Sequence, residues 1–408
     1  MKKILALILA FAMVLCFAAC GGKTAPTDEN AQPAGTGSDA QPAGTASDAE
    51  PIAVTGDYKV AMVTDYGDIT DQSFNQTTYE ACKEFCGANG VDFNYFKPAS
   101  DSDEDRVAMI ESAIDEGYNV VVLPGFAFGP AIKETAGPNP DVTFIALDVS
   151  AGDLGEDYEM PANLYCAVYQ EELCGYMAGY AAVKLGYTKL GFLGGMAVPA
   201  VVRYGYGFVQ GVDAAAAELA LTDVTVNYAY GNQFFGDADI TAAMDTWYQG
   251  GTQVVFACGG GIYTSAVDAA KKVEGAKVIG VDVDQAAVIA KYAAGDDGNE
   301  ADYADLTVTS AMKGLAPTVK TMLTAVVSGN FAEYGGKVDN LGLVSANPED
   351  NYVQIAGSTQ FSDGFTADDY AALVAKLFSG EITVSNDISI TAADNATVVT
   401  VTDLGNIK

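Results

Sequence analysis

The chain contains 408 residues, half of them apolar, and carries a formal net charge of −34 from 20 basic and 54 acidic residues. A chain of this size can bury a large core and is expected to form two domains. Because such an acidic surface repels phosphate backbones, nucleic acid is not expected as a partner. Histidine is absent, which excludes Ser-His-Asp and Cys-His catalysis and His-ligated zinc.

The first twenty residues have the pattern of an export signal. Lys2 and Lys3 form a basic start, an apolar run follows from Ile4, and small residues precede Cys20. This segment is too short and wrongly flanked for a stable membrane span. The sequence Phe17-Ala18-Ala19-Cys20 resembles a bacterial lipobox, which implies cleavage before Cys20 and lipidation of its sulfur. The alternative is an ordinary secretory signal with a chance cysteine.

Residues 21–54 are rich in Ala, Gly, Thr, Ser, Pro and Asp, and they contain the imperfect repeat Ala31–Thr36 and Ala40–Thr45. Few of these side chains are large enough to pack, so the segment is predicted to be a flexible tether between lipid and domain. The cysteines after Cys20 show no spacing typical of a disulfide framework or a metal site. No metal and no cofactor are therefore expected.

From Tyr58 onward, short apolar runs alternate with helical patterns. The expected strands are Lys59–Thr64, Asp92–Phe96, Val120–Pro124, Thr143–Asp148, Lys189–Leu193, Val224–Tyr230, Val254–Cys258, Lys277–Val281 and Leu306–Ser310. The expected helices are Ser73–Gly87, Glu104–Glu116, Ala178–Leu185, Gly205–Leu219, Ile240–Gln249, Thr264–Val273, Gly314–Val327 and Ala367–Phe378, and a Thr/Val-rich end can add strands. This alternation predicts an α/β fold with parallel sheets covered on both faces.

In such sheets ligands bind beyond the carboxyl ends of the strands, so the polar and aromatic residues after each run are the candidates for a site. These residues are Asp65, Asp71–Asn75, Pro124–Phe126, Asp148, Phe234, Phe235, Gly259–Gly261, Asp282–Gln285 and Lys313. Some have plainer explanations. Phe74 can be a core residue, Asp65 and Asp148 can cap helices, and Lys313 can be a surface lysine or neutralise Asp282.

Five motifs in a fixed order carry a more specific signal. They are Asp71–Asn75 (Asp-Gln-Ser-Phe-Asn), Gly191–Met196, the glycines 259–261, Val278–Gln285 and Thr309–Lys313. Together they resemble the basic membrane protein family of ABC-transporter substrate-binding lipoproteins, whose studied members bind nucleosides. The resemblance covers residues 58–344. It implies a type I periplasmic-binding fold, in which two Rossmann-like lobes with parallel sheets are joined by a hinge and enclose the ligand.

On this basis we expect four parts of the chain. They are a signal peptide at 1–20, a tether at 21–54, a first lobe at 55–163 plus 284–325, and a second lobe with a C-terminal extension at 164–283 plus 326–408.

The resemblance also implies roles for single residues. Phe74 matches the aromatic on one face of the base, and either Phe234 or Phe235 matches the aromatic on the other face. Asp65, Asn75 and Asp148 match groups that bond base edges, Asp282 matches a carboxylate for the ribose hydroxyls, and Lys313 and Gly259 match further sugar contacts. The loops 125–128 and 232–237 depart from commoner members, so the preferred base stays open between purine and pyrimidine.

The expected protein is a monomeric receptor without enzymatic activity. It would be anchored by lipid at the extracytoplasmic face of the cell membrane and would deliver a nucleoside, with purines favoured, to an ABC permease and ATPase. A stacked base is worth about 1–3 kcal/mol, and a carboxylate can accept charge-assisted bonds from both ribose hydroxyls. Because the expected cleft has several carboxylates and one lysine, nucleoside monophosphates are expected to bind far worse.

Other functions remain open at this point. The same fold can bind a free base, a sugar or a signal molecule, and it can act as a sensor or adhesin without transport. A nucleoside hydrolase would need a metal or an activated water, and no metal-ligand cluster is evident. Ser310 and Lys313 also fit the Ser-x-x-Lys motif of penicillin-recognising enzymes, but no Lys-Thr-Gly follows.

Overall fold

The computed structural model describes residues 52–65, 67–155, 157–296 and 298–408. The predicted signal peptide, the lipidation site Cys20 and most of the predicted tether lie outside these residues. No helix within the described ranges combines the length and apolar character of a membrane span.

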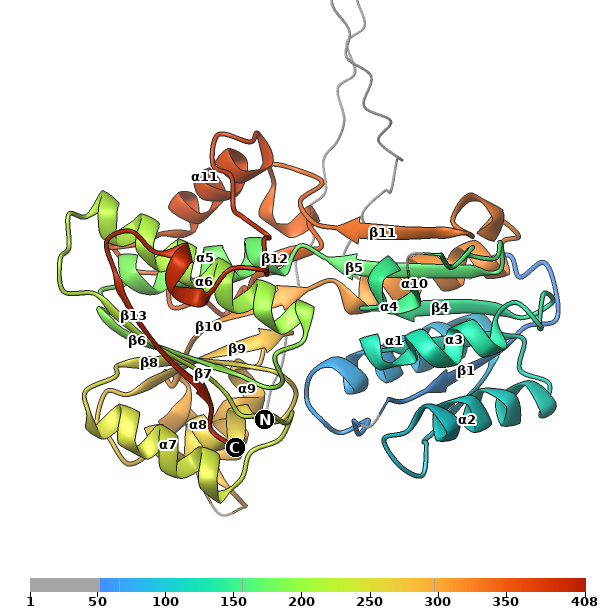
Figure 1. Cartoon of the computed structure of the whole chain (residues 1–408), viewed down its shortest axis with the longest axis horizontal. Helices are drawn as coiled ribbons and strands as arrows, with labels where there is room; N and C mark the ends of the chain where they lie inside the picture. The colour runs from blue at the N-terminus through green and yellow to red at the C-terminus, as the bar shows by residue number, and fades with distance from the viewer. Residues whose placement is uncertain (1–51, 66, 156, 297) are drawn as a thin grey trace, which may run out of the picture. The chain divides into compact units, whose positions relative to one another are not determined.

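The described residues build two β-sheets, each flanked by helices (Figure 1). The first sheet has the order β11-β5-β4-β3-β1-β2, and the second has the order β12-β10-β9-β8-β6-β7-β13. The first comprises β1 (Lys59–Val63), β2 (Asp92–Phe96), β3 (Val120–Pro124), β4 (Thr143–Leu147), β5 (Leu164–Tyr169) and β11 (Lys337–Leu341). The second comprises β6 (Lys189–Gly194), β7 (Thr225–Tyr230), β8 (Val254–Cys258), β9 (Lys277–Asp282), β10 (Thr307–Lys313), β12 (Val353–Ile355) and β13 (Thr400–Asn406).

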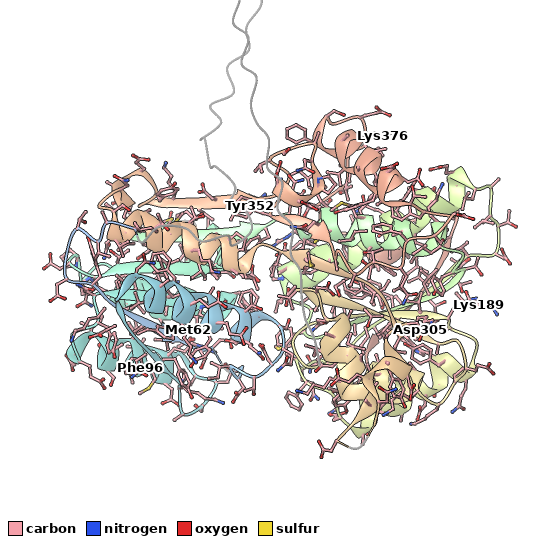
Figure 2. All side chains as sticks on the ribbon, turned by 180° about the vertical axis from the view of Figure 1, so that it is seen from behind. Met62, Phe96, Lys189, Asp305, Tyr352 and Lys376 are labelled. Atoms are coloured by element: carbon pink, nitrogen blue, oxygen red, sulfur yellow. The ribbon has the colours of Figure 1, made fainter. Side chains whose placement is uncertain are left out.

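Neighbouring strands run parallel, except that β12 pairs antiparallel with β10. Every residue of β3 and of β8 is buried, as expected where helices cover both faces of a parallel sheet. Figure 2 shows the side chains of both lobes from the opposite side, with Met62 of β1 inside the first lobe. The prediction of an α/β fold with two parallel-sheet lobes is thus confirmed.

The helices divide between the two lobes. The first lobe holds α1 (Phe74–Asn89), α2 (Asp103–Asp115), α3 (Gly129–Thr135), α4 (Ala151–Leu154) and α10 (Leu315–Val327). The second holds α5 (Glu171–Lys184), α6 (Pro199–Glu218), α7 (Ala238–Gln249), α8 (Tyr263–Ala270), α9 (Ala286–Ala294) and α11 (Ala367–Phe378). Helix α11 has the predicted bounds, and β13 is a strand at the Thr/Val-rich end.

The strand order corrects the expected lobe ranges. β5 and β11 belong to the first sheet, although the sequence predicts 164–169 and 337–341 in the second lobe. β10 belongs to the second sheet, although the sequence predicts 307–313 in the first lobe. The chain therefore crosses between the lobes after β5, after β10 and between β11 and β12. The crossings are tied together, since Gln170 N donates to Leu341 O at 2.9 Å and Gly314 N donates to Tyr352 O at 2.7 Å.

Helices α5 and α6 pack unusually closely beside these crossings. A Cβ at Gly175 of α5 would lie 2.2 Å from the Tyr204 carbonyl oxygen, and one at Gly207 of α6 would lie 2.0 Å from the Glu172 carbonyl oxygen. Such distances are impossible for any side chain, so glycine is required for this approach. The contact brings Glu171, at the start of α5, against Arg203 of α6.

Candidate functional site

A cleft of about 350 Å³ lies between the carboxyl ends of the two sheets. Its volume is within the usual range for a small-molecule site. Every residue for which the resemblance implied a ligand contact lines this cleft: Asp65, Phe74, Asn75, Asp148, Phe234, Phe235, Gly259, Asp282 and Lys313. The first sheet and α1 supply Asp65, Phe74, Asn75 and Asp148, whereas the others come from the second lobe.

The start of helix α1 is fixed by Asp71. Its carboxylate accepts hydrogen bonds from the backbone N–H groups of Ser73 at 2.9 Å, Asn75 at 2.9 Å and Gln76 at 3.0 Å. These are donors that a helix start leaves without partners inside the helix. Phe74 is the first residue of α1, so this capping by Asp71 determines where the Phe74 ring enters the cleft.

Asp65 and Asn75 form a polar pair in the first lobe. Asp65 Oδ1 accepts from Gly67 N at 2.6 Å and from Asn75 Nδ2 at 3.3 Å. Burial raises the pKa of Asp65 to about 6, against the opposing effect of these hydrogen bonds. Asn75 Oδ1 is buried and has no hydrogen-bond partner among the described residues. A buried acceptor without a partner costs about 1–3 kcal/mol, so this atom is suited to accept a hydrogen bond from a ligand.

Two aspartates hold equivalent positions at the strand ends of the two lobes. Asp148 directly follows β4 and Asp282 ends β9, and both have left-handed backbone conformations, with φ of 59° and 63°. Lys313 lies between them: its Nζ is 2.5 Å from Asp148 Oδ2 and 3.9 Å from Asp282 Oδ1. Asp148 Oδ1 has no hydrogen-bond partner among the described residues although it is buried.

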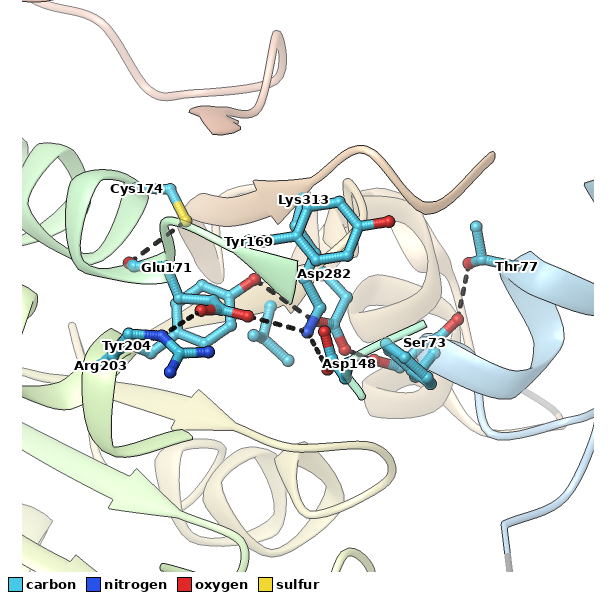
Figure 3. A network of polar contacts seen from close by, with 12 residues as sticks. Ser73, Thr77, Asp148, Tyr169, Glu171, Cys174, Arg203, Tyr204, Asp282 and Lys313 are labelled. Atoms are coloured by element: carbon cyan, nitrogen blue, oxygen red, sulfur yellow. Dashed lines mark hydrogen bonds and ion pairs between the residues drawn. The ribbon is translucent and has the colours of Figure 1, made fainter. Parts of the chain in front are cut away.

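Asp282 accepts one hydrogen bond from the first lobe and one from its own lobe. Its Oδ2 accepts from Ser73 Oγ at 2.5 Å and its Oδ1 accepts from Tyr204 Oη at 3.3 Å. Figure 3 shows Ser73, Asp282 and Lys313 meeting where the two lobes face each other. Burial raises the pKa of Asp282, although the Lys313 ammonium opposes that effect.

Glu171 connects the two cations that line the cleft. Its Oε1 lies 3.4 Å from Lys313 Nζ, and its Oε2 accepts from Arg203 Nε at 2.7 Å (Figure 3). Burial raises the pKa of Glu171, against the two cations, which lower it. Burial alone would lower the pKa of Lys313, but the surrounding carboxylates, led by Asp148, raise it. Lys313 is therefore a fully charged, buried ammonium.

Aromatic rings stand on both sides of the cleft. Lys313 Nζ lies 4.7 Å from the centre of the Phe74 ring, within the range of a cation–π contact. Phe234 packs against glycine backbone, because a Cβ at Gly195 or Gly259 would lie 2.4 or 2.7 Å from its Cδ1. Phe235, by contrast, is 62% exposed. The loop therefore presents one fixed ring and one exposed ring.

Several plainer explanations from the sequence are wrong. Asp71, rather than Asp65, caps α1, and Ser150, rather than Asp148, caps α4. Lys313 is buried rather than on the surface, and it does neutralise Asp282 as one of three carboxylates. Ser310 is fully buried and its Oγ accepts from Gln285 N at 3.1 Å, so its hydroxyl does not face the cleft as an acylated serine would.

Sequence reasoning missed Arg203, Tyr204 and Glu171. Pro199 at the first turn of α6 signals a helix start just before Arg203, but nothing local indicates that Glu171 would meet Lys313. Ser73 lies within a quoted motif, yet its bond to Asp282 depends on how the two lobes face each other. The described residues contain no group of three or more His, Cys, Asp or Glu side chains arranged to hold a metal ion.

Known proteins resemble this chain over most of its length. Residues 58–371 match the family model described as ABC transporter substrate-binding protein PnrA-like. The chain is 30% identical over 328 residues to the ABC transporter nucleoside-binding protein BmpA of Lactococcus lactis, covering 76% of this chain and 88% of that protein. It is 29% identical to the CD4+ T-cell-stimulating antigen of Listeria monocytogenes, over 70% of this chain and 80% of the antigen.

Among solved structures, an ABC transporter solute-binding protein from Conexibacter woesei superposes with a TM-score of 0.61 and 25% identity, covering 81% of this chain and 99% of that one. The chain belongs to the PnrA-like, or Bmp, family of ABC transporter substrate-binding proteins.

Proposed function

We propose that this chain is a lipid-anchored extracytoplasmic receptor that binds a nucleoside, with purines favoured, and delivers it to an ABC permease and ATPase. One observation carries the proposal. Phe74 of one lobe and Phe234 or Phe235 of the other line a single cleft that has strand-end carboxylates from both lobes. A nucleoside has two flat faces, a hydrogen-bonding edge and a vicinal diol, and these match aromatic walls and carboxylates.

The base edge would face Asp65 and Asn75. The unpaired Asn75 Oδ1 and the Asp65 carboxylate are acceptors, and they suit the N–H donors on a purine edge. Phe74 would stack on one face of the base. On the other face we favour Phe234 over Phe235, because glycine backbone fixes the Phe234 ring while Phe235 is exposed.

The ribose would lie toward Asp282, Lys313 and Gly259. Asp282 already accepts hydroxyl bonds from Ser73 and Tyr204, which supports its use as an acceptor for the ribose hydroxyls. Asp148 Oδ1 is an unpaired buried acceptor beside Lys313 and is available to a further ligand donor. These roles need no bond-making step, so the protein would act as a receptor rather than an enzyme.

Transport requires both lobes to contact the cargo, because a ligand shifts the lobes only through differential contacts with their arrangements. The cleft supplies such contacts from both sheets. Lipidation at Cys20 would keep the monomeric receptor at the outer face of the cell membrane, next to its permease. The name of the Lactococcus relative, a nucleoside-binding protein, supports this choice of cargo.

The proposal is tested by titrating the full chain with adenosine, guanosine, inosine, uridine, adenine and ribose in a calorimeter. We expect saturable binding of at least one purine nucleoside and none of ribose alone. Chromatography of the recovered ligand should return the intact nucleoside, whereas release of a free base would indicate a hydrolase. Binding of ribose or of an unrelated sugar, with no response to any nucleoside, would refute the stacked-base cleft. Mass spectrometry of the membrane-extracted protein tests the lipid at Cys20 separately.

A further inference from the structure

The last described residues of the chain contact the loop that carries Phe234 and Phe235. They lie beyond the part of the sequence that matches the family model, which ends at residue 371. We infer that residues 397–408, called here the edge segment, position the aromatic loop 232–237 and thereby set how long the cleft retains its ligand.

The edge segment is first fixed to helix α6. Asp213 Oδ1 accepts from the backbone N–H groups of Thr397 at 2.8 Å, Val398 at 2.7 Å and Val399 at 3.0 Å, and its Oδ2 accepts from Thr397 Oγ1 at 2.7 Å. One carboxylate thus takes four hydrogen bonds. Hydrogen bonds to a charged group are stronger than those between neutral groups, so the beginning of the edge segment is held firmly to α6.

The segment then runs along the outer edge of the second sheet. β13 pairs in parallel with β7, from Thr400 opposite Thr225 to Asn406 opposite Tyr230. In Figure 1, β13 lies beside β7 and ends near α7. Ile407 N donates to Tyr230 O at 2.8 Å. Tyr230 is the last residue of β7, so the segment reaches the point where the aromatic loop begins.

Lys408 completes the contact with the loop. Its Nζ forms an ion pair with Asp237 and lies 3.3 Å from Gln233 Oε1. Gln233 Nε2 in turn donates to Asp237 Oδ2 at 2.9 Å and to the Phe235 carbonyl oxygen at 2.8 Å. The side chain of Lys408 therefore joins both ends of the loop that presents the two rings.

Asp237 also fixes the loop to the body of the lobe. Its Oδ1 accepts from Asp239 N and Ile240 N, each at 3.0 Å, and so caps helix α7. With Lys408 on Oδ2 and the helix on Oδ1, both oxygens of Asp237 are used. Loss of Lys408 would remove the contact from the edge segment but leave the helix cap in place, which makes Lys408 the better residue for a test.

The test compares Lys408→Ala, Lys408→Arg and deletion of residues 400–408 with the unaltered full chain. Lys272→Ala is the matched control, because Lys272 Nζ also pairs with an aspartate of the same lobe, Asp245 of α7, at 2.8 Å to both oxygens, and neither residue lines the cleft. Hydrogen exchange of residues 232–237 is measured without ligand, and adenosine dissociation is measured by stopped flow.

We expect Lys408→Ala to speed exchange of residues 232–237 and adenosine dissociation about two- to fivefold, the scale of one exposed ion pair. Deletion of 400–408 should have a larger effect, while Lys408→Arg and Lys272→Ala should behave as wild type. The melting temperature of Lys408→Ala should not change. Unaltered exchange in residues 232–237 for both Lys408→Ala and the deletion overturns the inference.

The dissociation measurement rests on the proposed function, whereas the exchange measurement does not. If the wild-type chain binds no nucleoside, the proposed cargo is wrong, and exchange alone still decides whether the edge segment holds the loop. Faster dissociation in Lys272→Ala as well would assign the effect to surface charge in general and would also overturn the inference.

Discussion

Lys313, the last residue of a second-lobe strand, places its ammonium 2.5 Å from the carboxylate of Asp148 in the first lobe. Glu171 and Asp282 lie within 4 Å of the same nitrogen, at 3.4 and 3.9 Å. Glu171 directly follows one chain crossing and Lys313 directly precedes another. The charge cluster of the cleft is therefore also a part of the hinge.

Replacing Lys313 with methionine should strongly destabilise the fold, because it leaves the buried carboxylates without their cation. Removing one partner of a buried ion pair costs about 3–5 kcal/mol. Urea unfolding measures the change. Lys320→Met is the matched control, since Lys320 pairs with Glu84 on the surface, where such pairs contribute about 0–1 kcal/mol. Equal midpoints for the two variants would show that the cluster does not stabilise the fold.

Phe74→Ala should weaken nucleoside binding by about 1–3 kcal/mol, the value of one stacked base. Calorimetric titration measures the affinity, and thermal unfolding shows whether the fold is intact. Phe378→Ala serves as the control, because Phe378 is 46% exposed on the surface and does not line the cleft. Unchanged affinity in Phe74→Ala would remove Phe74 from the site.

Alanine variants of the two aromatic residues in loop 232–237 should differ in their effect on nucleoside binding. Phe235→Ala should change the free energy of unfolding by less than about 0.5 kcal/mol, as exposed positions usually do, and should weaken binding little. Phe234→Ala should weaken binding by about 1–3 kcal/mol. If the larger loss of affinity falls on Phe235→Ala, the exposed ring is the one that stacks.

Asp65 should make stability depend on pH. The pKa of Asp65 in the folded state, about 6, lies above its ordinary value of 3.8, so the folded state binds this proton more tightly. The resulting contribution to stability decreases as pH rises from about 4 to 6. At pH 7.5 Asp65→Asn should therefore be more stable than wild type without ligand, by an amount on the order of 3 kcal/mol. The prediction is contradicted if the stability that Asp65→Asn gains over wild type is no larger at pH 7.5 than at pH 4.

The proton on the Asp65 carboxyl should also be released when ligand binds. Donors on a purine edge favour the charged carboxylate, so nucleoside binding near pH 6 should release protons. Calorimetry in two buffers with different ionisation enthalpies measures that release. Asp65→Asn should abolish it. Equal apparent enthalpies in both buffers for the wild type would indicate that Asp65 does not contact the bound base.

Nucleoside monophosphates should bind far more weakly than nucleosides. Six aspartates line the cleft, namely Asp65, Asp68, Asp71, Asp148, Asp153 and Asp282, against the two cations Lys313 and Arg203. Lys313 is already surrounded by carboxylates, and Arg203 is paired with Glu171. Parallel titrations with adenosine and its monophosphate measure the difference, and similar affinities would contradict the electrostatic argument.

The sequence predicted most strands and the cleft residues because both depend on local patterns. Runs of apolar residues show β3 and β8, and the residues after them are where parallel sheets place their ligands. Strands β5, β11 and β12 are not among the expected strands, and α5 begins at Glu171 rather than at the expected Ala178. Gly175 and Gly179 look like helix breakers in isolation, yet they permit the close contact with α6.

The polar start of α5 also depends on residues that are distant in the sequence. Glu171 is buried because Lys313 and Arg203 reach it from other elements, and no periodicity in its own segment reports such partners. The lobe assignment of β5, β10 and β11 was wrong for the same reason. Which sheet a strand joins depends on pairing across long stretches of sequence, and an apolar run has the same appearance in either lobe.

The hydrogen bond from Ser73 to Asp282 has a consequence for transport efficiency. A cargo hydroxyl that takes the place of Ser73 on Asp282 would gain only the difference between two similar hydrogen bonds, because the protein already provides a hydroxyl there. Discrimination then comes chiefly from the parts of the cargo for which the empty cleft has no substitute, such as a flat ring between the lobes. A molecule that offers only hydroxyls would gain little binding free energy. Sugars in the surroundings would therefore seldom occupy the receptor, and the importer would not hydrolyse ATP on their account.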